Sequence, residues 1–100
     1  MHPDSATDPL LLEQRRALLR ERLHAIRTEL AALTADYRAL PRSGLLLDTP
    51  GIGALTTPGY CVAGAAEVFD EAAIELDAAD DALARAADYT TRLRRAALND

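Results

Sequence analysis

Apolar residues recur at steps of four and three from Leu19 to Leu40, and this spacing is the strongest signal in the chain. The series is Leu19, Leu23, Ile26, Leu30, Leu33, Tyr37 and Leu40, with Leu12 continuing it upstream and Arg16 interrupting it. Its mean period of 3.5 is typical of helices that pack along their length. Asp8-Pro9 supplies a helix start and Pro41 a stop. The pattern therefore predicts a helix over residues 9–40.

A second series with the same alternation predicts another helix over residues 59–98, beginning near Thr57-Pro58. Its members are Val62, Ala65, Phe69, Ala72, Leu76, Ala79, Leu83, Ala86, Thr90, Leu93 and Ala97. Every other position is mostly alanine, and small residues let a facing backbone come close. We therefore expect one all-α domain, a helical hairpin of two long antiparallel helices. Residues 1–8 are expected to be a disordered tail.

The expected hairpin also pairs charges. If Leu40 lies near Tyr60, the numbers of facing residues add up to about 100, as expected for two antiparallel helices. Arg20 and Arg22 should then lie beside the acidic residues at 77, 80 and 81. Such surface pairs contribute about 0–1 kcal/mol each, so they orient the helices more than they stabilise them.

The linker between the helices, residues 41–58, is long and apolar for a helix–helix connection. Its large apolar residues are Leu45, Leu46, Leu47, Ile52 and Leu55. One interpretation is that they cover the end of the hairpin. The other is that they form a surface presented to a partner.

Two helices bury only one seam, so apolar positions are left over for a partner. We expect dimerisation into a four-helix bundle. The predicted interface residues are Leu19, Leu23, Ile26, Leu30, Leu33, Tyr37, Leu40, Phe69, Leu76, Leu83 and Leu93. Two further stripes remain to be covered, one at Ala66, Ala73 and Ile74 and one at Leu10, Leu11 and Leu18.

Composition narrows the function classes. All eleven basic residues are arginine, and sixteen acidic residues give a net charge of −5. That balance disfavours nucleic-acid or anionic-membrane binding. No apolar run reaches the roughly 18 residues of a membrane span, and the polar N-terminus lacks the features of a secretory signal. We expect synthesis in the cytoplasm, with signal-peptide-independent export left open.

The candidate chemistry is sparse. Residues 45–53 resemble the Asp-Xaa-Xaa-Gly switch segment of small GTPases, but the chain has no phosphate-binding loop and no lysine. Glu21 and His24 have the Glu-Xaa-Xaa-His spacing of di-iron carboxylate bundles, in a single copy. Cys61 is the only cysteine. We therefore expect no enzyme, no cofactor, no metal and no small-molecule substrate.

One family resemblance concerns the second helix. The stretch from Phe69 to Ala73, followed by Leu76, Leu83, Ala86-Ala87 and Tyr89, is similar to the second helix of the small helical-hairpin substrates of actinobacterial type VII secretion. The resemblance implies an exported dimer that forms an antiparallel four-helix bundle. The tryptophan of the family's Trp-Xaa-Gly turn is absent here, and Tyr89 is followed four residues later by Leu93 instead of an acidic residue.

The leading hypothesis is thus a non-enzymatic interaction protein that pairs with itself or with a related hairpin. A type VII secretion substrate or its partner is the first alternative. An oligomeric carboxylate protein that binds metal is the second.

Overall fold

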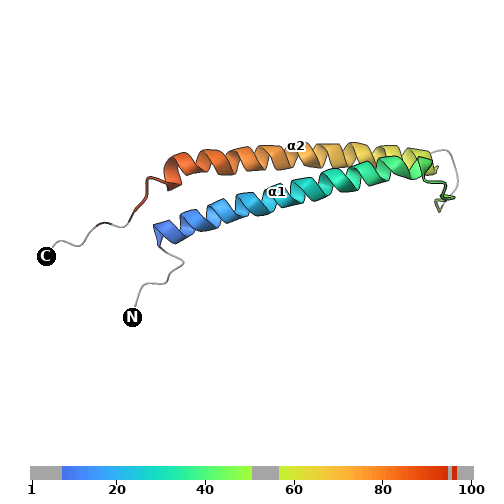
Figure 1. The fold of residues 1–100 in the computed structure, drawn as a ribbon. Helices are drawn as coiled ribbons and strands as arrows, with labels where there is room; N and C mark the ends of the chain where they lie inside the picture. The colour runs from blue at the N-terminus through green and yellow to red at the C-terminus, as the bar shows by residue number, and fades with distance from the viewer. Residues whose placement is uncertain (1–7, 51–56, 95, 97–100) are drawn as a thin grey trace. The chain divides into compact units, whose positions relative to one another are not determined.

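The computed structural model describes residues 8–50, 57–94 and 96. Helix α1 spans Pro9–Ala39, the short 3₁₀ helix η2 spans Leu40–Arg42, and helix α2 spans Pro58–Thr90. Figure 1 shows α1 and α2 side by side. No β-strand occurs in the described parts of the chain. The predicted all-α hairpin is therefore confirmed.

Both long helices begin where the sequence places a capping residue ahead of a proline. The Asp8 carboxylate accepts a hydrogen bond of 2.9 Å from the backbone N–H of Leu10. The Thr57 hydroxyl accepts one of 3.3 Å from the N–H of Tyr60. Each bond satisfies an N–H group that has no partner within the helix, and the proline at the first helical position lacks such a group. The two predicted starts are confirmed.

The end of α1 is set by Pro41 and a turn that follows it. The backbone N–H and the hydroxyl of Ser43 both donate to the carbonyl of Leu40, at 3.0 and 2.7 Å. Gly44 has a φ of +82°, a conformation that residues with a Cβ rarely adopt. These contacts close the helix at Ala39 and turn the chain away from its axis.

Helix α2 ends earlier than the expected residue 98, at Thr90. The N–H groups of Arg92 and Leu93 donate to carbonyls three residues back, which tightens the chain into a turn. The Thr91 hydroxyl donates to the Ala87 carbonyl, a local bond available outside a regular helix. Leu93 and Arg94, which follow this turn, border the hollow at the start of α1 together with Asp8, Pro9 and Leu10.

The hairpin divides into two units, and both helices contribute to each. The terminal unit joins Met1–Ala25 to Asp77–Asp100, and the loop unit spans Ile26–Leu76. Both units contain contacts between the two helices.

In the loop unit the helices meet through small and aromatic side chains and through an ion pair between Arg38 on α1 and Asp70 on α2. Thr34 and Ala66 each keep only 5% of their surface exposed, and they are the only buried residues in the described part of the chain. The Thr34 hydroxyl donates to the Leu30 carbonyl, so its burial leaves no unsatisfied group. The rings of Tyr37 and Phe69 lie 5.4 Å apart between centroids, within the range of a favourable aromatic pair.

The face of α1 that meets α2 is rotated from the predicted seam. Beyond the first turn, where Pro9 and Leu11 are also half-buried, the less exposed positions of α1 are 13, 16, 20, 23, 27, 30 and 34. Of the predicted seam, Leu23 and Leu30 belong to this face. Helix α2 follows the prediction more closely, because Phe69, Leu76 and Leu83 are half-buried. Ala66 and Ala73, which the sequence left over for a partner, are instead covered within the hairpin.

Leu30 offers a test of this packing. Leu30→Asp places a charge on the covered face of α1 and should destabilise the fold by about 3 kcal/mol, through lost burial and desolvation of the carboxylate. Circular dichroism during heating should show an earlier loss of helix. Leu46→Asp is the matched control, because the Leu46 side chain is fully exposed. Equal melting of the two variants would contradict the assignment of Leu30 to the packed face.

Candidate interaction surface

Several polar groups join the two helices of the terminal unit, beside half-buried side chains such as Leu23 and Leu83. Arg16 donates from Nε to both carboxylate oxygens of Glu13, at 2.9 and 3.1 Å. Its Nη1 donates to the backbone carbonyl of Leu83 on α2, at 3.0 Å. Thr90 donates its hydroxyl to the same Glu13 carboxylate. The residue that interrupts the leucine series is therefore a cross-helix anchor.

A second polar cluster centres on Asp80. Arg20 donates to its two carboxylate oxygens at 2.9 and 3.3 Å, a bidentate geometry. His24 Nε2 lies 3.0 Å from Asp80 Oδ1. The predicted proximity of Arg20 and Asp80 is thus confirmed. Arg22 lies elsewhere, in a shallow depression on α1 with Arg15, Leu18 and Leu19.

These contacts change the acidity of both carboxyl groups. The Arg16 guanidinium, aided by the Thr90 hydroxyl, lowers the pKa of Glu13 from its ordinary 4.5 to about 2. The Arg20 guanidinium, followed by His24, lowers the pKa of Asp80 from 3.8 to about 2. Both shifts have the same cause: hydrogen bonds from cationic donors favour the ionised carboxylate.

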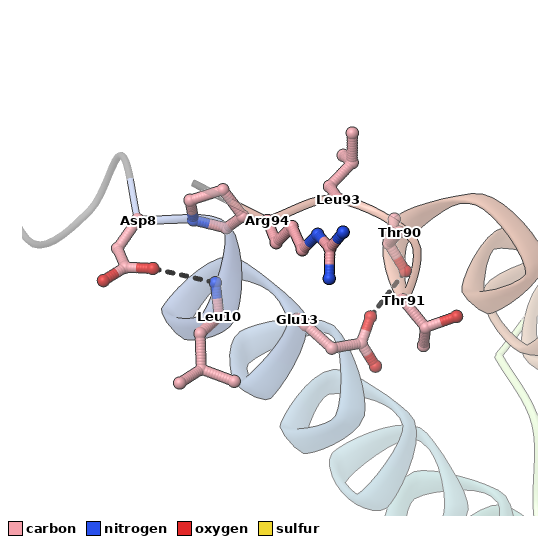
Figure 2. A pocket seen from close by; sticks show the side chains of 8 residues that line it. Asp8, Leu10, Glu13, Thr90, Thr91, Leu93 and Arg94 are labelled. Atoms are coloured by element: carbon pink, nitrogen blue, oxygen red, sulfur yellow. Dashed lines mark hydrogen bonds between the residues drawn. The ribbon is translucent and has the colours of Figure 1, made fainter. Parts of the chain in front are cut away.

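At the end of the terminal unit, the start of α1 and the end of α2 border a hollow of about 380 Å³ (Figure 2). Glu13 points toward Thr90 across it, and Arg94 also lines it. The Asp8 carboxylate turns to the N–H of Leu10. The polar groups of Asp8, Glu13 and Thr90 are thus already used in holding the helix ends.

One line of apolar residues on α1 is left exposed by the hairpin. We call this line the outer stripe, and it consists of Leu12, Leu19, Ile26 and Leu33. Their exposed fractions are 44%, 50%, 50% and 45%, and they recur every seven residues. Leu12 and Leu19 belong to the terminal unit, Ile26 and Leu33 to the loop unit. In both units, therefore, the same heptad position is left uncovered.

The hairpin contacts show which side carries the outer stripe. The positions that directly follow the four stripe residues are 13, 20, 27 and 34. This line belongs to the packed face of α1, and its Arg20 pairs with Asp80 on α2. At 100° per residue the stripe lies on the other flank of the packed face. By the same geometry, Ala65, Ala72, Ala79 and Ala86 form that flank of α2. One side of each unit is therefore ionic, and the other consists of leucine or isoleucine beside alanine.

Some of the remaining predicted interface residues are half-buried and others are exposed. Tyr37 is 37% exposed despite its ring contact with Phe69, and Leu40 is half-buried within η2. Leu93, expected in the seam of the second helix, lies beyond the end of α2 and is 65% exposed. Of the stripe that we expected the hairpin to leave uncovered, Leu10 and Leu18 are exposed, whereas Leu11 is half-buried, contrary to the expectation.

The linker leucines do not all cover the end of the hairpin. Leu45 is 66% exposed, Leu46 is fully exposed, and Leu47 is half-buried. Ile52 and Leu55 lie outside the described residues. Exposure of Leu45 and Leu46 contradicts a capping role for these two side chains and leaves them accessible to a partner.

The candidate chemical groups do not converge. His24 contacts Asp80, and the described residues contain no group of three or more histidine, cysteine or acidic side chains that could hold a metal ion. Cys61 is a free, exposed thiol. Among the described helices, none is both long and apolar enough to cross a membrane.

Comparison with protein families, with curated proteins and with solved structures gave no match.

The sequence did not indicate which half of the leucine series would face α2. A usable signal was present in the residues next to the series. Glu13, Arg16 and Arg20 are spaced three and four apart, and α2 carries an acid at 80 where the neighbouring heptads have Ala73 and Ala87. Complementary charges at matching heights indicate the contact line better than the leucines do.

The two lowered pKa values predict acid sensitivity. A carboxyl whose pKa is lower in the folded state stabilises the fold above its unfolded value, and this contribution is lost as the pH falls through the folded value. The melting temperature should therefore change little between pH 7 and 5 and decrease between about pH 4 and 2. Circular dichroism melts across this range measure the effect.

Variants separate these two groups from the other acids. Glu13→Gln with Asp80→Asn should lower the melting temperature at pH 7 and flatten its decrease in acid. Glu21→Gln, at an exposed position, should leave the profile as it is. A doubly substituted chain with an unchanged acid profile would refute the role of these carboxylates.

Proposed function

We propose that this protein acts by association: it is a non-enzymatic helical-hairpin interaction protein whose leucine–alanine side packs on a partner, giving a four-helix bundle. The single observation that supports the proposal is the outer stripe. Four large aliphatic side chains recur on one helix at heptad spacing, each about half exposed. That spacing is the one with which helices pack lengthwise.

The alanine line on α2 adds to this argument. The side chains of Ala65, Ala72 and Ala86 are half-buried, and alanine has no polar side-chain atom to place beside the outer stripe. A second hairpin could therefore approach this side closely without desolvating charges. On the ionic side the same approach would have to cover Arg20 and Asp80, which costs far more.

The free energy of such an association can be compared with that of known protein–protein contacts. Stable protein–protein contacts remove about 800 Å² of surface per partner, at about 25 cal/mol for each apolar Å² before the costs of binding. A stripe of four aliphatic residues with an adjoining alanine line is a suitable nucleus for such a contact.

Size-exclusion chromatography with light scattering tests the proposal. The expected mass is a multiple of the 10.8 kDa chain, and the dimer is the simplest form. Leu19→Asp should lower the mass toward that of the monomer while the helical signal persists, because Leu19 lies on the outer stripe and not on the face that meets α2.

Ile74→Asp is the control. Ile74 is 68% exposed on α2 and does not adjoin the outer stripe or the alanine line in the heptad. It should leave the mass unchanged. A wild-type chain that runs as a folded monomer at high micromolar concentration would refute association with itself.

A further inference from the structure

We propose that the partner is a second copy of this chain, and that α1 of one copy packs antiparallel on α1 of the other through the outer stripe. This inference rests on the proposed function and specifies its partner and geometry. It follows from the charges beside the stripe, which differ between the two units.

Each stripe residue is followed three positions later by an exposed charged residue. In the terminal unit these are Arg15 and Arg22, after Leu12 and Leu19. In the loop unit they are Glu29 and Asp36, after Ile26 and Leu33. Residues three apart lie on the same helix face, so the charges border the stripe. The border is basic in one unit and acidic in the other.

Such a border is complementary to itself when the second helix runs in the opposite direction. With Ile26 of one copy opposite Ile26 of the second copy, Leu19 lies opposite Leu33 of the second copy. The borders then bring Arg22 beside Glu29 and Arg15 beside Asp36. The two-fold symmetry repeats both pairs, so that every border charge meets one of opposite sign.

Other arrangements lack this match. A parallel pairing would bring arginine near arginine and acid near acid, which is unfavourable at an interface. Packing α1 of one copy on α2 of the other would place the border beside Val68, Glu75, Ala82 and Tyr89, the equivalent positions on α2. Of these four positions only Glu75 is charged, so three of the four border charges on α1 would have no charged neighbour. The antiparallel α1–α1 contact therefore uses the observed charges best.

Disulfide cross-linking tests the alignment directly. Because Cys61 is exposed and would react, the variants carry Cys61→Ala. Ile26→Cys should form a covalent dimer on mild oxidation. Leu19→Cys alone should not, whereas a mixture of the Leu19→Cys and Leu33→Cys chains should cross-link to a heterodimer. Efficient cross-linking of Leu19→Cys with itself would indicate a parallel pair and overturn the proposal.

A charge exchange gives an independent test. Arg22→Glu converts two attractive pairs per dimer into repulsive ones and should raise the dissociation constant about tenfold. Adding Glu29→Arg should restore it to near the wild-type value. In a parallel dimer residue 22 would lie opposite its own copy, so Arg22→Glu would replace arginine–arginine repulsion with glutamate–glutamate repulsion and leave the dissociation constant nearly unchanged. Circular dichroism of each variant checks that the hairpin still folds.

The outcomes separate this inference from the proposed function. If the wild-type chain is a monomer, both self-association and the α1–α1 geometry are refuted. A dimer in which Ile26→Cys does not cross-link, and in which Glu29→Arg does not rescue Arg22→Glu, would retain the proposed association and refute the α1–α1 geometry.

Discussion

Two helices lying side by side can each bury only one face, and this limit governs the whole chain. Thr34 and Ala66 are the two buried residues in the part of the chain that the structure describes, and most large aliphatic side chains retain a substantial exposed fraction. A layer of helices needs a second layer to form a core. The outer stripe is exposed on α1 in both units, and we propose on this ground that the chain acts by association.

The contact between the helices has a different character in each unit. In the loop unit it depends on small side chains, on the Tyr37–Phe69 ring contact and on the exposed Arg38–Asp70 ion pair. In the terminal unit it depends on Arg16 and Arg20, whose hydrogen bonds reach Glu13, Asp80 and a backbone carbonyl. Apolar contacts are insensitive to charge state, whereas carboxylate–guanidinium contacts depend on pH and ionic strength. Charge-dependent contacts therefore join the helices in both units, and they are more numerous in the terminal unit.

Much of the fold could be predicted from the sequence, because it depends on local rules. Asp8 and Thr57 mark the helix starts through their side-chain acceptors, and Pro41 marks the end of α1 by steric exclusion. The end of α2 could not be predicted this way. The apolar series continues past Thr90 to Leu93, but a periodic pattern alone does not determine where a helix ends.

The candidate surface was predictable only in part, for a related reason. A heptad series shows which positions seek apolar cover, but it does not show which neighbour covers each one. Leu23 and Leu30 face α2, whereas Leu19 and Ile26 do not, although all four have the same sequence signature. The choice depends on Arg20 and Asp80, whose pairing turns one flank of α1 inward. Tertiary contacts of this kind are invisible to periodicity.

The Arg20–Asp80 pair has one more consequence, for the phase of the two helices. Leucine and alanine repeats of seven look alike after a shift by one repeat, so apolar packing alone would tolerate sliding of α2 along α1. Such a shift would place Ala73 or Ala87 opposite Arg20 and leave its half-covered guanidinium without its carboxylate. A single polar pair among equivalent apolar layers is a known means of fixing helix alignment. Asp80, together with Thr90 opposite Glu13, thus selects one alignment out of several that hydrophobicity would accept equally.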